Sequence, residues 1–200
     1  MRGARRRRDE RELVALPPTL PIPEDDGGAR HLPGVRVPDV ALASTEGGSM
    51  GLADLDSSRT VVYCYPRTGR PGEPPLREDW DRIPGARGCT AESCAFRDRH
   101  AEIASLGVGV YGVSTQAPED QREAARRLRL RFPLLSDAGL ELVRALRLPT
   151  FEVAGRTLLK RLTLIVRDGR IEHVWYPVFP PDRHAEEVLG WLRRHPIRAA

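Results

Sequence analysis

Short apolar runs alternate along this chain with stretches in which apolar residues recur every three or four positions. The runs are rich in β-branched and aromatic residues, which is typical of buried strands, and the periodic stretches predict amphipathic helices. Strands are predicted over 60–66, 108–115 and 132–137, and helices over 89–106, 117–131, 138–148 and 182–195. The positions expected to be buried in the first of these helices are Ala95, Phe96, Ile103 and Leu106.

The C-terminal part adds two strands around Asp168-Gly169, a dipeptide that strongly favours a hairpin turn. Asp182 is the expected cap of the last helix. The order strand, helix, strand, helix, strand, helix, hairpin, helix predicts an α/β domain with a central mixed β-sheet flanked by helices on both faces. A parallel core finished by an antiparallel hairpin is the thioredoxin-like arrangement.

Two segments lack these patterns. Residues 1–33 combine charge, proline and glycine, the composition of a disordered or loosely docked extension, so the folded domain is predicted over 34–200. The arginine run from Arg5 to Arg8 is expected to be a solvated tail. Residues 67–88 are also dense in proline and glycine and predict a long loop, which at this length is usually functional or mobile.

Composition narrows the class of protein. No run of eighteen apolar residues exists, so no membrane span is predicted, and the first arginines lack the apolar segment of a secretory signal. Three cysteines in 200 residues make no disulfide framework, which favours the cytoplasm. The net charge of +4 is modest, and acids and bases alternate, so no nucleic-acid partner is expected. Lys160 is the only lysine, so all other basic residues except histidine are arginine. This preference for arginine is expected from the codon usage of a GC-rich genome more than from a binding site.

The strongest chemical signal is the stretch GARGCTAESCAFRD (85–98), which carries Cys89 and Cys94. Cys89 opens the predicted helix, where unpaired N–H groups and the positive end of the helix dipole stabilise an anion. The thiolate is the reactive form of cysteine, and peroxides oxidise an accessible thiolate to a sulfenic acid. A second thiol nearby can condense with that acid to give a disulfide.

Cys94 lies five residues further along the same predicted helix. Five residues of regular helix rise about 7.5 Å, and the two side chains diverge by roughly 140°. A disulfide needs Cα atoms roughly 4.4 to 6.8 Å apart and converging Cβ atoms. Either the first turn therefore unwinds after oxidation, or Cys94 is only a core residue.

These residues also match a family. The stretch PGARGCTAESCAFRD (84–98) resembles the active-site segment of peroxiredoxins of the bacterioferritin comigratory protein (PrxQ) type, Pro-Gly-Cys-Thr-x-x-x-Cys-x-Phe-Arg-Asp. The resemblance extends over residues 34–195 and includes the segments VRVPDVALAS, VVYCYP, VYGVST, FPLLSD and RLTLIVRDGRI.

The resemblance implies a thiol-dependent peroxidase that reduces hydrogen peroxide or organic hydroperoxides. Cys89 would be the peroxidatic cysteine and Cys94 the resolving one, joined in an intramolecular disulfide during turnover. Arg161 falls at the family's active-site arginine, which would stabilise the thiolate and the peroxide, and Pro66 matches the proline that shields the site. A thioredoxin-like protein would be the reductant, no cofactor or metal would be needed, and the protein would be a monomer or homodimer.

The chain departs from the family pattern in two ways. The pattern Pro-x-x-x-Thr-x-x-Cys places the cysteine seven residues after the proline, but Pro66 and Cys89 are 23 residues apart. This spacing implies an insertion of 16 residues in the active-site loop, around 67–84. The family threonine is replaced by Ala86, and Thr68 is a candidate source of the missing hydroxyl.

Several other interpretations stay open. Cys64, in the middle of an apolar run, is expected to act as a small hydrophobic core residue. Trp80, on the insertion, either covers the site or anchors the loop by packing. A zinc site is disfavoured, because Cys-x4-Cys is a poor ligand spacing and the five histidines are scattered.

Two other functions compete with the peroxidase. A thioredoxin-fold disulfide oxidoreductase would normally carry Cys-x-x-Cys, which is missing here. A non-enzymatic redox-sensing or binding module would use the insertion and the arginine-rich tail to recruit a partner.

Overall fold

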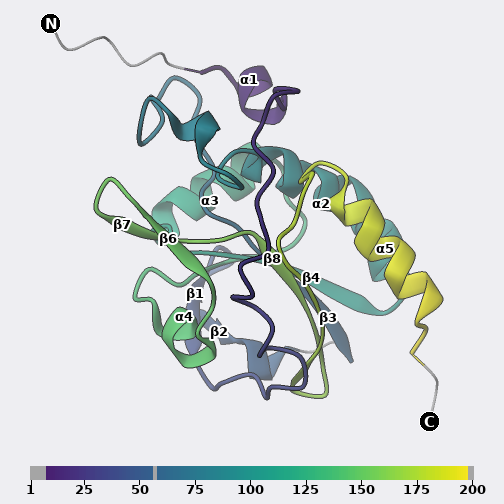
Figure 1. The fold of residues 1–200 in the computed structure, drawn as a ribbon. Helices are drawn as coiled ribbons and strands as arrows, with labels where there is room; N and C mark the ends of the chain where they lie inside the picture. Colours follow the sequence, from purple (N-terminus) through teal and green to yellow (C-terminus); the bar gives the residue numbers. More distant parts are fainter. Residues whose placement is uncertain (1–7, 56–57, 198–200) are drawn as a thin grey trace, which may run out of the picture.

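A seven-stranded mixed sheet forms the centre of the computed structural model, which describes residues 8–55 and 58–197 (Figure 1). The strand order is β2-β1-β5-β4-β3-β8-β9, with β3, β4 and β5 parallel and the other neighbours antiparallel. A separate hairpin consists of β6 and β7. The strands are β1 (Ala41–Ser44), β2 (Ser49–Gly51), β3 (Arg59–Cys64), β4 (Val108–Ser114), β5 (Leu134–Ser136), β6 (Thr150–Val153), β7 (Arg156–Leu159), β8 (Leu162–Arg167) and β9 (Arg170–Trp175).

Helices cover both faces of this sheet, because side chains on a strand point alternately to opposite sides. On β3, Val61 and Tyr63 belong to a core shared with α2, α3 and α5, whereas Val62 and Cys64 face α4 and residues 29–37. The helices are α1 (Glu10–Val14), α2 (Cys89–Ala104), α3 (Pro118–Arg127), α4 (Glu141–Leu146) and α5 (His184–Arg194), with short 3-10 turns η1 (Leu52–Asp54) and η2 (Trp80–Arg82).

The predicted α/β class with a central mixed sheet is confirmed, and each predicted strand and helix is present at the expected place. The predicted hairpin turn is formed by Asp168 and Gly169, with φ angles of 50° and 68°, as a two-residue hairpin turn requires. The sequence analysis did not predict the β1-β2 hairpin, the β6-β7 hairpin, helix α1 or the short 3-10 turns η1 and η2.

The segment expected to be a disordered or loosely docked extension instead packs on the domain over residues 8–33. Leu13, Ala29 and Leu32 are buried, and Leu32 belongs to the main core. The Nζ atom of Lys160 lies 2.6 Å from a carboxylate oxygen of Asp26. In Figure 1 this segment runs from α1 down across the front of the sheet.

Some details of the prediction need correction or fall outside the structure. Asp182 does not cap α5, whose N-cap residue is Arg183 with no capping side chain. Leu106, expected to be buried, follows the end of α2 and is 37% exposed. Of the arginine run, residues 5–7 lie outside the described residues, whereas Arg8 pairs with Asp81 at 2.6 Å rather than standing free in solvent.

A helix that combines enough length and apolar character to cross a membrane is not found in the described part of the chain.

Candidate active site

Cys89 is the first residue of α2, as the sequence predicted. The residue before it, Gly88, is the N-cap and has a φ of 108°, which side-chain-bearing residues rarely adopt. A Cβ atom at Gly88 would also lie 2.4 Å from Cγ of Pro181. Glycine is therefore required here, and the turn that it makes places Cys89 at the start of the helix.

The sulfur of Cys89 accepts hydrogen bonds from two separate parts of the chain. The backbone N–H of Arg67 lies 3.3 Å from Sγ, and Nη2 of Arg161 lies 3.2 Å from it. The Cys89 side chain is buried, and the N–H groups of the first helical turn add their partial positive charge. These donors are placed to hydrogen-bond negative charge on the sulfur or on a reacting oxygen.

Arg161 directly precedes β8 and reaches the site from the sheet. Its Nη2 also donates to the carbonyl oxygens of Gly85 and Arg87, both at 3.2 Å, and its Nη1 pairs with Glu92. Burial opposes the charge of Arg161, but the adjacent anionic groups of Cys89 and Glu92 raise its pKa overall. The guanidinium is thus a fixed cation beside the sulfur.

Glu92 is a site residue that the sequence analysis missed. It is completely buried, and burial raises its pKa although the charge of Arg161 acts in the opposite direction. Its Oε1 atom has no hydrogen-bond partner within the described structure. One signal was available: Glu92 is three residues after Cys89, so it shares that residue's helix face and can approach the same guanidinium.

The residues proposed from the loop after β3 are also close to the site. Pro66 is buried at the end of the strand, and Ala86, at the family's threonine position, is completely buried. The Thr68 hydroxyl, however, donates to Oε1 of Gln116 at 3.1 Å, and no hydrogen bond from it to Cys89 is found among the described residues. The structure therefore differs from the predicted thiolate contact, and Gln116, which the sequence analysis did not identify, holds the loop at Thr68 instead.

The other two cysteines occupy different surroundings. Cys94 lies within α2 and is buried, and burial raises the pKa of its thiol. All three cysteines are free thiols, and a regular helix keeps Cys89 and Cys94 from bonding. Cys64 is completely buried in the core on the far side of the sheet, as predicted, and burial raises its pKa strongly.

A small cavity of about 40 Å³ lies directly over Cys89. Its walls come from α1, from the loop after β3 and from the start of α2. Trp80 lines the cavity and is also packed against Ala86, so it both covers the site and anchors the loop. Within residues 8–55 and 58–197, no three His, Cys, Asp or Glu side chains cluster as metal ligands would.

Comparisons with known proteins agree with this geometry. The family model described as Redoxin matches residues 32–189. Peroxiredoxin Bcp of Escherichia coli K12 is 30% identical over 79% of this chain and 93% of its own length. The chloroplastic peroxiredoxin Q of Gentiana triflora is 28% identical over 90% of this chain and 78% of its own length. The crystal structure of peroxidoxin BcpB from Mycobacterium tuberculosis superposes with a TM-score of 0.68 at 28% identity, covering 84% of this chain and all of that one.

Proposed function

Because the chain belongs to the redoxin family and is a peroxiredoxin of the Bcp and PrxQ type, we propose that its Cys89 thiolate reduces hydrogen peroxide or organic hydroperoxides. The observation that carries the proposal is the pair of hydrogen bonds to Cys89 Sγ, from the side chain of Arg161 and the backbone of Arg67. These donors stabilise the nucleophile before reaction and the developing oxyanion during it.

In the first step, the Cys89 thiolate attacks the distal oxygen of the peroxide. The S–O bond forms as the O–O bond breaks, so that the sulfur becomes a sulfenic acid while water or an alcohol leaves after protonation. Arg161 and the Arg67 N–H lie where they can hold the peroxide oxygens as charge moves onto the leaving group. In this proposal Pro66, which is buried and directly precedes Arg67, shields the sulfur from water.

In the second step, the thiol of Cys94 attacks the sulfenic sulfur of Cys89, which forms a disulfide and releases water. This step requires the first turn of α2 to unwind, because both residues belong to one regular helix. A thioredoxin-like dithiol then reduces the disulfide by exchange and is itself oxidised. We place this cycle in the cytoplasm, where such reductants keep thiols reduced.

Thr68 has a positioning role in this proposal. Both its backbone N–H and its hydroxyl bond Oε1 of Gln116, at 2.8 and 3.1 Å, which fixes the loop that presents the Arg67 N–H to the sulfur. The hydroxyl itself does not touch the reacting atoms.

Product mapping tests this assignment. Reduced protein is treated with one equivalent of hydrogen peroxide and analysed by mass spectrometry, beside Cys94→Ser and a Cys64→Ala control. The wild type and Cys64→Ala should yield a Cys89–Cys94 disulfide, whereas Cys94→Ser should yield a sulfenic acid at Cys89 that dimedone traps. Oxidation at Cys64, or no oxidation at Cys89, would contradict the proposal and favour a disulfide oxidoreductase or a binding module.

A further inference from the structure

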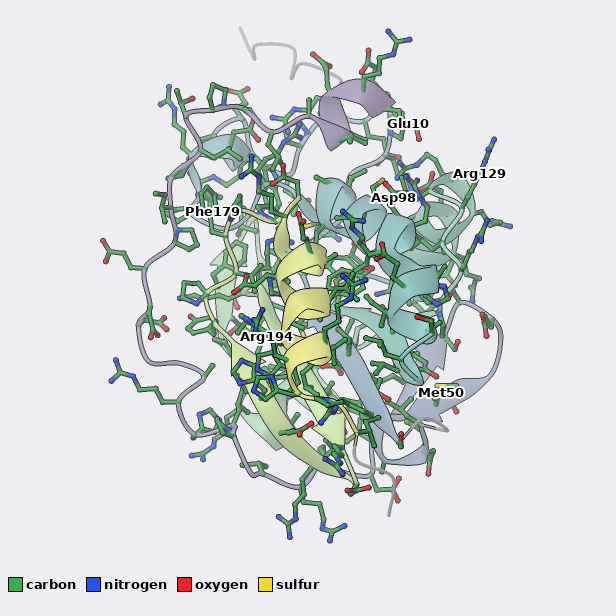
Figure 2. The ribbon with its side chains drawn as sticks, turned by 90° about the vertical axis from the view of Figure 1, so that its right-hand side faces the viewer. Glu10, Met50, Asp98, Arg129, Phe179 and Arg194 are labelled. Atoms are coloured by element: carbon green, nitrogen blue, oxygen red, sulfur yellow. The ribbon has the colours of Figure 1, made fainter. Side chains whose placement is uncertain are left out.

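The cavity at Cys89 is lined by two segments that do not belong to the central sheet. One is residues 8–16, which contain α1, and the other is the loop over residues 67–88, which holds the predicted insertion. The redoxin match begins at residue 32, so residues 8–16 lie outside the family region. Figure 1 shows α1 beside this loop at the top of the molecule, and in Figure 2 α1 lies above the start of α2.

Several contacts tie residues 8–16 to the site. The guanidinium of Arg87, two residues before Cys89, donates to the carbonyl oxygens of Glu12 and Ala15 at the end of α1. The backbone N–H of Gly72 donates to the carbonyl of Arg8 at 2.7 Å. An arginine at a helix C-terminus both satisfies unpaired carbonyl groups and complements the helix dipole. Residues 8–16 are thus fixed in place over the cavity.

Two apolar side chains, one from each of these segments, line the cavity. Leu13 of α1 is 7% exposed and packs so closely on the loop that a Cβ atom at Gly69 would be 2.9 Å from its Cδ2. Trp80, from η2, is also 7% exposed and packs against Ala86, Val153 and Leu158. Trp80 therefore cannot move away without disrupting its packed cluster, and Leu13 is held against the loop at Gly69.

We propose that Leu13 and Trp80 determine substrate size, so that this peroxidase prefers peroxides as small as hydrogen peroxide over bulky organic hydroperoxides. The inference rests on the proposed function and deepens it. The cavity volume of about 40 Å³ is the space open to the centres of water-sized spheres. One water molecule needs roughly 10–15 Å³ in this measure, so the cavity accommodates about three water-sized groups. Hydrogen peroxide fits within it, whereas the aromatic ring of cumene hydroperoxide requires the walls to separate.

The test compares two peroxides in the full-length reduced protein. Stopped-flow rate constants for Cys89 oxidation are measured with hydrogen peroxide and with cumene hydroperoxide, in the wild type, Leu13→Ala and Trp80→Ala. Val14→Ala is the matched control, because Val14 is the neighbour of Leu13 on α1 but is 38% exposed. The readout is the ratio of the cumene hydroperoxide rate to the hydrogen peroxide rate, which cancels a general loss of activity.

The wild type should react faster with hydrogen peroxide than with cumene hydroperoxide. Leu13→Ala and Trp80→Ala should each raise the ratio of the cumene hydroperoxide rate to the hydrogen peroxide rate by about tenfold or more. Val14→Ala should leave this ratio unchanged. Detachment of α1 in Leu13→Ala would also raise the ratio, because it opens the same wall. Equal rates for both peroxides in the wild type, or an unchanged ratio in both wall variants, would overturn the size selection alone. If neither peroxide oxidises Cys89 faster than free cysteine, the proposed function fails, and the size selection fails with it.

Discussion

Arg161 donates to the sulfur of Cys89 at 3.2 Å through the same guanidinium that pairs with Glu92. Cys89 and Glu92 both belong to the first turns of α2, whereas Arg161 comes from the sheet at the start of β8. One buried cation thus links the helix that carries the nucleophile to the sheet beneath it. The reactivity of Cys89 consequently depends on how α2 packs on the sheet.

Replacing Arg161 with lysine should slow peroxide reduction. Lysine keeps the positive charge but cannot hold Cys89, Glu92 and two carbonyl groups with one planar fork of donors. Loss of one oriented donor typically lowers a rate by about 100-fold, and we expect a drop of that order in the rate constant with hydrogen peroxide. Arg167→Lys, at the partly exposed end of the same strand, is the control and should react like the wild type. A rate for Arg161→Lys close to the control's would contradict this role.

Replacing Glu92 with glutamine should change how stability depends on pH. Burial raises the pKa of Glu92 above its ordinary 4.5, so the folded protein binds this proton more tightly than the unfolded chain. Unfolding then releases a proton, and the stability contributed by Glu92 falls as pH rises from about 4.5 through its folded pKa. Glutamine has the same shape and does not titrate.

The measurement is urea unfolding of both reduced proteins between about pH 4 and 8. The free energy of unfolding of the wild type minus that of Glu92→Gln should decrease as the pH rises. An increase with pH would mean that pairing with Arg161, not burial, dominates the ionisation of Glu92.

Replacing Arg87 with alanine should speed disulfide formation after Cys89 is oxidised. Arg87 ties the turn before Cys89 to the carbonyl groups of Glu12 and Ala15, and we expect this tie to restrain the unwinding of the first turn of α2. A hydrogen bond to a charged group contributes about 1.5–3 kcal/mol, so loss of this tie should accelerate resolution by about tenfold to a hundredfold. The measurement is the rate at which the Cys89–Cys94 disulfide appears after a single peroxide turnover, in samples quenched with acid and analysed by mass spectrometry. Arg82→Ala, exposed on the same loop, should leave this rate unchanged, and an unaltered rate in Arg87→Ala would show that α1 does not restrain the helix.

Replacing Thr68 with valine should have a small effect on the peroxide rate. The hydroxyl bonds Gln116 and not the sulfur, and the Thr68 backbone N–H keeps its own bond to Gln116 in the variant. Loss of one neutral hydrogen bond is worth about 1 kcal/mol, which limits the slowing to about fivefold. The rate constant with hydrogen peroxide is the measurement. A loss of about 100-fold would show that the hydroxyl acts directly on the reacting atoms.

The sheet and its helices were predictable from the sequence because their patterns are strong. The run ending at Cys64 is apolar on both faces, as a central strand must be, and Asp168-Gly169 specifies its turn locally. The β6-β7 hairpin gave no such signal, because its pattern is broken by charged residues and it pairs outside the main sheet. Helix α1 has only five residues, so its stability comes from tertiary contacts that no local pattern reveals.

The site was predictable where side-chain chemistry is local and hidden where it depends on packing. Cys89 follows a glycine at a helix start, which the sequence shows directly. The sequence alone gives Glu92 the pattern of an exposed helical residue. Only the fold shows that Glu92 pairs with Arg161. The Arg67 donor is a backbone N–H, which any residue would supply, so only the loop conformation reveals it. The same holds for Gln116, which meets Thr68 across 48 residues of chain.

The most direct test of the account is the second-order rate constant of the reduced protein with hydrogen peroxide, followed by tryptophan fluorescence in stopped flow. Cys89→Ser and Cys64→Ala are measured in parallel. The account predicts a rate orders of magnitude above that of free cysteine, retained in Cys64→Ala and abolished in Cys89→Ser. A wild-type rate equal to that of free cysteine would contradict it, because the donors around Cys89 would then give the thiol no advantage.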